Sequence, residues 1–195
     1  MRTVDPARHA ARRRHILDAA AGVFAVKGFE SATVAEICRA ASVGSGTLFH
    51  YFPDKAAIFR AIFQEDHELL LAELANLDTT DPAAAFWTIV DLLAKDVTEP
   101  AAGGLVIAIL GRLPLDQELA ETLVASEQAA LGRLAELITR LQQQGTVDPT
   151  LPAAHAAQWV STIIDGLYLR CGDDDFDPKQ ELRTLHTVLT RFLFR

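Results

Sequence analysis

The side chains best suited to specific binding contacts lie between Thr33 and Lys55, in the stretch TVAEICRAASVGSGTLFHYFPDK. Its second half crowds Thr47, His50 and Tyr51 into barely two helical turns. A helix this short is unstable alone in water and needs support from its neighbours. A short helix held out from a compact support is the arrangement of a helix-turn-helix, whose chemistry is hydrogen bonding to base edges and phosphates.

The elements that must position this short helix are also predicted by the sequence. Thr33 and Glu36 fit a capping box, and apolar residues then recur at three- and four-residue spacing as far as Ala41, which indicates a first helix. The serines and glycines of residues 42–46 favour a sharp change of direction. The stretch therefore predicts a helix, a turn and a second helix in succession.

Charge is divided unevenly along the chain. The net charge of -8 would by itself argue against a nucleic-acid partner. Residues 1–60, however, hold nine Lys and Arg against five Asp and Glu, whereas residues 61–195 hold nine against twenty-one. A basic head on an acidic body can bind a polyanion at one end only. We expect a phosphate contact from the arginines before the helix-turn-helix, with Arg13 as our choice; the alternative is a solvated helix face.

Patterns typical of catalytic and metal sites do not occur in the sequence. The six histidines are spread over five predicted helices, and none belongs to an H-E-x-x-H motif or a Cys/His pair at zinc spacing. There is no G-x-S-x-G elbow and no phosphate-cradling loop. The run Asp173-Asp174-Asp175 could bind a divalent cation, but a solvated loop is the preferred interpretation. We expect no enzyme activity, no metal and no cofactor.

Helical periodicity extends through the rest of the chain. Half of the residues are apolar, which argues against disorder, and no apolar/polar alternation persists long enough for a strand. We predict an all-α chain of about nine helices. Three belong to an N-terminal helix-turn-helix domain, residues 1–54, and six to a C-terminal domain, residues 55–195.

Several features point to the same cellular compartment. No apolar run approaches the ~20 residues that span a bilayer, and the N-terminal segment lacks the apolar region of a secretory signal. The two cysteines, Cys38 and Cys171, do not suggest a disulfide framework. We therefore expect a cytoplasmic protein with no membrane partner.

The stretch RRRHILDAAAGVFAVKGFESATVAEICRAASVGSGTLFHYFPDKAAIF closely resembles the DNA-binding domain of the tetracycline-repressor (TetR) family. The matching features are ILDAA and VF, then GF, then T-V-x-x-I, and finally A-x-V-x-x-G-T-L-F-x-x-F ahead of P-D-K. The segment QGTVDPTLPAAHAAQWVSTIIDGLYLR is similar to the equivalent region of the betaine-regulator (BetI-like) branch. The resemblance implies that residues 55–195 bind a ligand and form a dimer.

Three positions depart from the family pattern. Ser42 stands where the family commonly has glycine, and Gly44 where it has a capping serine. Because glycine at a helix cap costs little stability, we expect the turn to form. Phe49 stands where the family usually has a tyrosine that touches phosphate, so we predict that this contact is lost and that Phe49 belongs to the core.

The resemblance also implies which residues contact DNA. Thr33 and Lys55 would bind phosphates on either side of the reading helix, and Lys55 would do so at a helix N-terminus that itself attracts anions. The exposed positions of that helix are occupied here by Ser45, Gly46, Thr47, His50 and Tyr51, although His50 could instead be a surface residue without a role in binding. Among them, Thr47 can hydrogen-bond a base edge or pack on a thymine methyl group.

A reading helix of two turns contacts few base pairs, and symmetric dimers solve this by reading two half-sites ~34–36 Å apart. The last two predicted helices carry apolar stripes that could form an intermolecular four-helix bundle, as in this family. The predicted interface residues are Ala156, Val160, Ile164, Leu167, Leu185, Leu189 and Phe192. The alternative is that these stripes are buried within their own chain.

The resemblance further implies a pocket for a small-molecule effector of unknown identity. The candidate lining residues are Phe86, Trp87, Leu105, Ile109, Arg112 and Trp159. Each could instead be an ordinary core residue. Arg112 could meet an anionic ligand, although a salt bridge to a carboxylate of the body is the preferred interpretation.

Together these features predict a ligand-responsive transcriptional repressor. A homodimer would bind a pseudo-palindromic operator in double-stranded DNA, and an effector would release it by moving the helix that starts at Lys55. One alternative is a helical protein that binds a small molecule or a partner and recognises DNA weakly, an interpretation supported by Gly44 and Phe49. Another is an activator of the same fold.

Overall fold

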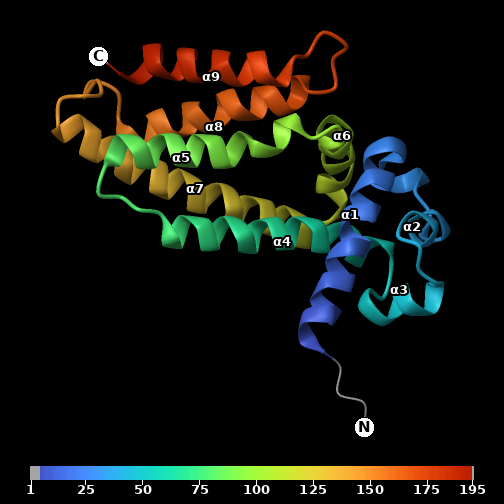
Figure 1. Cartoon of the computed structure of the whole chain (residues 1–195). Helices are drawn as coiled ribbons and strands as arrows, with labels where there is room; N and C mark the ends of the chain where they lie inside the picture. The colour runs from blue at the N-terminus through green and yellow to red at the C-terminus, as the bar shows by residue number, and fades with distance from the viewer. Residues whose placement is uncertain (1–4, 195) are drawn as a thin grey trace. The chain divides into compact units, whose positions relative to one another are not determined.

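The computed structural model describes residues 5–194 of the chain. Over this range it contains nine α-helices, two short 3₁₀ turns and an isolated antiparallel bridge between Val147 and Phe194 (Figure 1). The elements are α1 (Pro6–Ser31), α2 (Val34–Ala40), α3 (Ser45–Tyr51), α4 (Lys55–Asn76), α5 (Pro82–Ala94), η1 (Lys95–Thr98), α6 (Ala102–Arg112), η2 (Leu113–Leu115), α7 (Gln117–Gln143), α8 (Ala153–Arg170) and α9 (Pro178–Leu193). The prediction of an all-α chain with about nine helices is confirmed.

Helices begin where the capping residues predict. The carboxylates of Asp5, Asp81 and Asp177 accept bonds from first-turn amides of α1, α5 and α9, and a proline follows each of them. At the start of α2, Thr33 and Glu36 form the predicted capping box. Local side-chain chemistry therefore accounts for these four helix starts.

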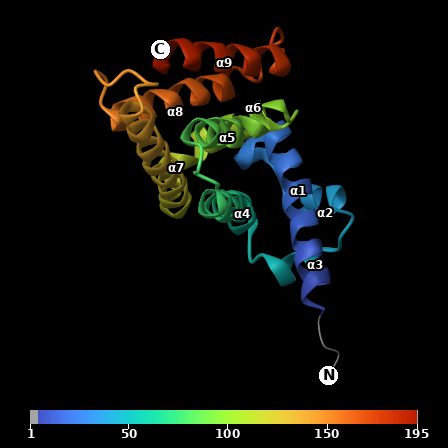
Figure 2. The same ribbon diagram turned by 60° about the vertical axis from the view of Figure 1, so that its left-hand side comes forward.

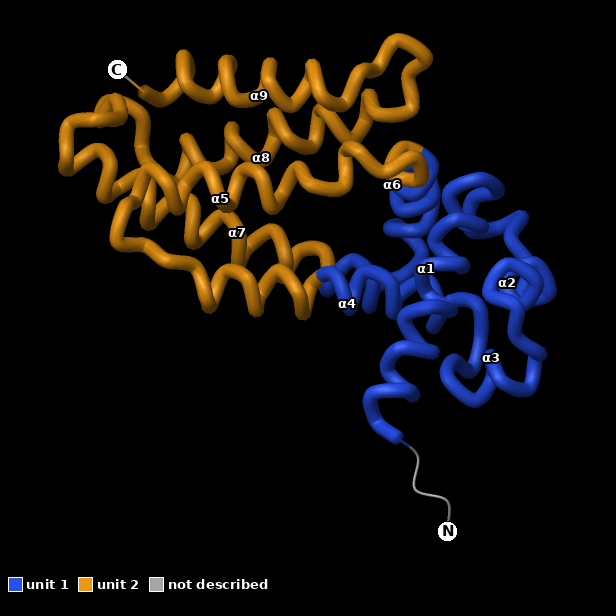
Figure 3. The backbone as a smooth tube through the Cα atoms, viewed as in Figure 1, with its two compact units in different colours: residues 1–66, 104–122 blue, residues 67–103, 123–195 orange. Residues whose placement is uncertain are grey.

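The chain divides into two compact units (Figure 3). Unit 1 comprises residues 1–66 and 104–122, and unit 2 comprises residues 67–103 and 123–195. By packing, unit 1 therefore contains α1 to α3 together with the first half of α4, most of α6 and the start of α7. The functional boundary after residue 54 stays a prediction, and the predicted domain ends at residues 1 and 195 lie outside the described range.

A cluster of phenylalanines forms the core of unit 1. The ring of Phe59 on α4 lies 4.9 Å from that of Phe24, 5.2 Å from that of Phe29 and 5.1 Å from that of Phe63. Helix α6 approaches α1 closely at Gly104, where an added Cβ would lie 2.0 Å from the carbonyl oxygen of Ala25. Only a residue without a side chain fits here, so this glycine sets the distance between the two backbones.

Unit 2 is built around helices α5, α7, α8 and α9. Figures 1 and 2 show α8 and α9 side by side, and α5 also packs on α8. The phenol of Tyr168 on α8 donates to the carbonyl of Leu93 on α5 at 2.9 Å, which ties these two helices together. No helix in the described range has both the length and the apolar character needed to cross a bilayer.

The apolar stripes of α8 and α9 largely face the core of unit 2. Six of the seven predicted interface residues are buried there, because their sides of the helices pack on α5 and α7: Ala156, Val160, Ile164, Leu167, Leu185 and Leu189. The seventh, Phe192, is 37% exposed. Burial within their own chain, the alternative stated above, describes these six residues.

Candidate nucleic-acid interface

Helix α3 presents one apolar side to unit 1 and leaves the other in solvent. Leu48 is fully buried, and Phe52 at the C-cap is nearly so. The predicted reading residues lie on the other side or at its edge: Ser45, Gly46, Thr47 and His50 are exposed, and Tyr51 is half-buried. Because nothing lies within 4 Å of the position that a Cβ on Gly46 would occupy, this glycine opens the surface for close approach of another molecule.

Phe49 is 50% exposed, so its prediction as a core residue is wrong. Successive residues of an α-helix are rotated by about 100°. A seven-residue helix that buries Leu48 and Phe52 therefore turns Phe49 away from the core. Its ring lies among the reading residues and can make apolar contacts with a thymine methyl group or a sugar.

The turn before α3 forms despite its departures from the family pattern. Ser42 adopts a φ of 51°, in the left-handed region that glycine occupies without strain. Gly44 is the N-cap of α3 and supplies no side-chain bond. The amide of Val43 donates to the carbonyl of Cys38 at 2.9 Å, which closes the end of α2. The expected turn is present, but it retains strain at Ser42.

Lys55 is engaged inside unit 1. Its Nζ donates to the carbonyls of Phe29 at 2.6 Å, Glu30 at 3.0 Å and Ala32 at 2.9 Å, and it lies 4.5 Å from the centre of the Phe29 ring. An ammonium has three donors, so a phosphate contact by this side chain requires that one of these bonds be released. The phosphate contact stays a prediction, and the position of Lys55 makes it a cap for the end of α1.

Thr33 is likewise held by its own helix. Its hydroxyl donates to Glu36 Oε2 at 2.9 Å and accepts from the Glu36 amide at 3.3 Å. The pKa of Glu36 is lowered to about 2, first by the bond from Lys27 and then by the bonds from Thr33. Glu36 is thus ionised at neutral pH and fixes the start of α2 through both neighbours.

Among the described residues, some arginines of α1 are held in ion pairs with α4, and others are exposed without one. Arg13 forms an ion pair with Glu65 on α4, and its guanidinium lies 5.3 Å from the centre of the Phe52 ring. Arg14 reaches the same carboxylate at 3.4 Å. Arg8 and Arg12 are exposed, and no ion pair to either occurs within residues 5–194. Phosphate binding is therefore easier for Arg8 and Arg12 than for Arg13, the residue chosen from the sequence.

A buried carboxylate joins three helices of unit 1. Asp116 is 6% exposed and caps the start of α7, where the Leu119 amide donates to Oδ1 at 3.2 Å. Arg60 of α4 and Arg112 of α6 reach its Oδ2 at 3.2 and 3.4 Å. Burial alone would raise the pKa of Asp116, but the amide bond and both arginines outweigh it and hold this pKa below its usual value. The arrangement fixes the ends of α6 and α7 to α4.

The six predicted ligand-lining residues are divided between the two units, and their role in ligand binding stays a prediction. Phe86 is buried in the core of unit 2, and Trp87 stacks on the rings of His186 and Phe194. Leu105, Ile109 and Arg112 are half-buried in unit 1, and Trp159 is 48% exposed. For Arg112 the structure confirms the preferred interpretation, a salt bridge to a carboxylate, here Asp116.

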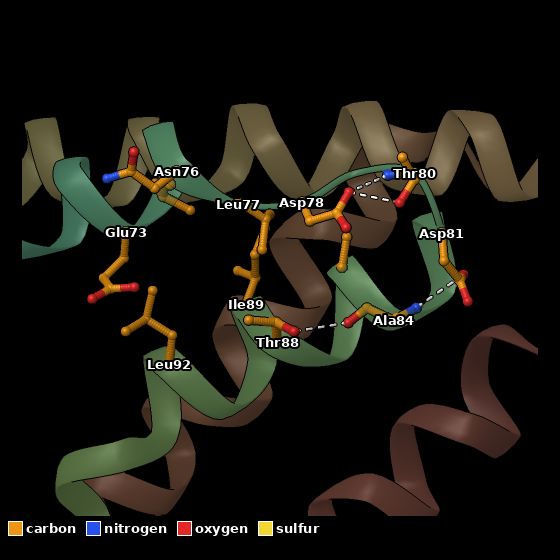
Figure 4. Close-up of a pocket in the computed structure, with 12 residues that line it drawn as sticks. Glu73, Asn76, Leu77, Asp78, Thr80, Asp81, Ala84, Thr88, Ile89 and Leu92 are labelled. Carbon is orange, nitrogen blue, oxygen red and sulfur yellow. Dashed lines mark hydrogen bonds between the residues drawn. The ribbon is translucent and has the colours of Figure 1, made fainter.

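Unit 2 instead contains a cavity of about 380 Å³ between the end of α4 and α5 (Figure 4). Its apolar side is made by leucine, isoleucine and alanine side chains, and its polar side includes three carboxylates, those of Glu73, Asp78 and Asp81. The Thr80 hydroxyl and amide bond Asp78 at 2.6 and 2.9 Å and lower its pKa. No lysine, arginine or histidine lines this cavity. No motif in the sequence indicates it.

Comparison with known proteins places both parts of the chain. Residues 16–62 match the family described as bacterial regulatory proteins, tetR family, and residues 88–193 match the BetI-type transcriptional repressor, C-terminal. The HTH-type transcriptional regulator UidR of Escherichia coli is 27% identical over 160 residues, covering 80% of this chain and 79% of that protein. The HTH-type transcriptional repressor Rv1474c of Mycobacterium tuberculosis is 28% identical over 180 residues, covering 92% and 91%.

A solved structure shows the same fold. It is a transcriptional regulator from Saccharomonospora viridis in complex with choline, which superposes with a TM-score of 0.77 at 19% identity. The match covers 95% of this chain and 99% of that one.

Proposed function

This chain belongs to the TetR family of bacterial regulatory proteins, and from that premise we propose that it is a repressor whose helix α3 reads an operator in double-stranded DNA. The proposal rests mainly on the amphipathic character of α3, whose one face buries Leu48 and whose other face leaves Thr47, Phe49 and His50 in solvent. Membership of a family of regulators confirms that the chain is not an enzyme. A repressor acts on DNA, which supports a cytoplasmic location.

Base reading falls to the exposed side of α3. Ser45 and Thr47 supply hydroxyls for base edges, Gly46 allows close approach, and Phe49 supplies an apolar contact. Tyr51 and the free arginines Arg8 and Arg12 supply phosphate contacts. This set keeps the predicted reading residues, adds Phe49 and prefers Arg8 and Arg12 over Arg13.

A homodimer is proposed to bring two such helices to one operator, because symmetric pairs read two half-sites. The support comes from large apolar side chains that unit 2 leaves exposed on α8 and α9: Trp159, Leu169, Val188 and Phe192. These four residues, rather than the six buried ones, would form the intermolecular contact.

The effector is proposed to be an organic cation that binds the cavity of unit 2. The lining combines apolar side chains with three carboxylates and contains no basic side chain. Such a lining favours a small positively charged molecule with an apolar body. The acidic lining of this chain, and not the likeness to the choline-bound regulator, carries this part of the proposal.

The test of DNA reading begins with selection of operator sequences from random double-stranded DNA. Fluorescence anisotropy should show specific binding that weakens steeply with salt, since phosphate contacts release counterions. Thr47→Ala should raise the Kd about 10-fold, the size of one lost base contact. Thr139→Ala, an exposed threonine of α7, is the matched control. Failure to select any sequence, or equal losses in the two variants, would refute the reading role of α3.

The effector proposal is tested by thermal shift against quaternary ammonium compounds and their neutral isosteres. A ligand at 100 times its Kd adds about 2.7 kcal/mol of stability. The cations should raise the Tm and lower operator affinity, and Glu73→Gln should reduce both effects. Equal shifts from the neutral isosteres would refute a cationic effector without bearing on DNA reading.

A further inference from the structure

A histidine far from the helix-turn-helix motif in sequence lies against the reading helix. The ring of His9 on α1 lies 4.5 Å from the ring of Tyr51, tilted by 38°. His50 packs edge-on against the same tyrosine at 5.3 Å, and the two imidazoles are 6.0 Å apart. The two imidazoles and the phenol thus form one cluster of three rings on unit 1.

In the described part of the chain, the side-chain contacts of these two imidazoles are with Tyr51 and with each other, and neither forms an ion pair with a carboxylate. On α1, Asp5 lies one turn before His9, and its carboxylate accepts from the Ala7 amide at 3.1 Å. Arg12 and Arg13 lie one turn after it, and Arg13 is held by Glu65 of α4.

Within residues 5–194, the elements packed on α1 place no carboxylate in an ion pair with His9 or His50; Glu65 of α4 pairs with Arg13 and Arg14 instead. On α3 the facing groups are His50 and Tyr51. In the link to α4, the carboxylate of Asp54 accepts from the Ala57 amide at 2.7 Å. A positive charge on either imidazole would therefore be repelled by the neighbouring arginines and stabilised by an anion bound at this surface.

We propose that His9 and His50 are operator contacts whose protonation accompanies binding, so that this surface reads the phosphate backbone more tightly as the pH falls. The proposal rests on the function proposed above and adds His9, a residue that the helix-turn-helix motif does not contain. Imidazoles in general titrate near pH 6.5. Phosphates favour the charged form and oppose its loss.

The sign of the pH dependence follows from this preference. Anionic DNA favours the protonated over the neutral imidazole, so operator affinity should rise as the pH falls and decrease as the pH rises. Each imidazole that becomes charged on binding adds at most one proton, and each added cation steepens the salt dependence by about 0.9 in log-log slope. Tyr51, which contacts both rings, would be positioned by them.

The test measures the anisotropy of the selected operator with the full chain at pH 6, 7 and 8 over a range of salt. For the wild type, the Kd should fall at least about 10-fold from pH 8 to pH 6, and the salt slope should steepen by about 1 to 2. The double variant His9→Gln/His50→Gln should lose both dependences. His155→Gln, an exposed histidine of α8, should keep them.

A second variant keeps the proposal testable if the double variant folds poorly. His9→Arg places a permanent cation at the same position, so its affinity should depend less on pH than that of the wild type. A wild-type affinity that does not change with pH, or a full pH dependence in the folded double variant or in His9→Arg, overturns the inference. Absence of specific binding at every pH would instead overturn the proposed function.

Discussion

The close approach of α6 to α1 gives the sharpest prediction about the stability of unit 1. In Gly104→Ala the new Cβ would lie 2.0 Å from the carbonyl oxygen of Ala25 and 2.6 Å from its carbonyl carbon. Both are backbone atoms, so no side-chain rotation can relieve the overlap. One helix must move by more than about 1 Å to restore van der Waals contact. Gly111→Ala, on the same helix, is the control, because nothing lies within 4 Å of the added atom.

Both substitutions gain the higher helix propensity of alanine, but only Gly104→Ala creates a steric overlap with the backbone. Alanine is favoured over glycine in a helix by about 1 kcal/mol, which applies to both positions. Overpacking costs about 1 to 3 kcal/mol, and a clash with rigid backbone belongs at the upper end. Gly104→Ala should therefore lower the free energy of unfolding by about 2 kcal/mol, whereas Gly111→Ala should raise it by up to about 1 kcal/mol.

The assay is urea unfolding and thermal unfolding of both variants and the wild type, each followed by helical circular dichroism. A loss of about 2 kcal/mol should lower the Tm of Gly104→Ala by about 4 to 8 °C. If Gly104→Ala is as stable as the wild type, or if both variants change in the same direction, the α1–α6 packing described above is wrong.

Substitutions at two further positions, Ser42 and Asp116, test local features of unit 1. Ser42→Gly should raise the free energy of unfolding by about 1 kcal/mol, because glycine removes the strain at a φ of 51°. Ser42→Val should lower the free energy of unfolding. If urea unfolding gave the opposite order of stabilities, strain at this turn would be refuted. Asp116→Ala should cost about 2 to 4 kcal/mol at pH 7, since it removes a helix cap and the shared partner of Arg60 and Arg112. Because the pKa of Asp116 is lowered in the folded protein, the difference in free energy of unfolding between wild type and Asp116→Ala should be full at pH values above the usual carboxyl pKa. It should shrink as the pH falls through the lowered pKa of Asp116. A difference that does not change with pH would contradict a stabilising role of the two ion pairs.

Features that depend on local chemistry could be predicted from the sequence. An Asp-Pro pair caps the helix that follows it whatever packs around it, and the Thr33–Glu36 box closes within four residues. The bridge from Arg112 to Asp116 is likewise an i,i+4 contact. Each of these outcomes is decided by neighbours in the chain, which periodicity and spacing describe well.

Features that depend on which face meets which partner could not be predicted. Phe49 is as apolar as a core residue, and only the choice of Leu48 and Phe52 as anchors leaves it in solvent. Lys55 meets carbonyls some 25 residues away in the sequence, where no pattern marks an uncapped helix end. The stripe of α8 is apolar whether it faces its own chain or a second one. The contact of His9 on α1 with Tyr51 on α3 is likewise a tertiary contact, so no local sequence pattern indicates it.

The central claim, that the exposed side of α3 reads base pairs, is tested most directly by combining protein and operator substitutions. Kd values are measured for the wild type and Thr47→Ala on the selected operator and on operators with each base pair replaced in turn. If α3 reads bases, Thr47 should couple by at least about 1 kcal/mol to one base pair in each half-site and to none elsewhere. Equal losses for Thr47→Ala on every operator would contradict it, because they would place Thr47 outside base recognition.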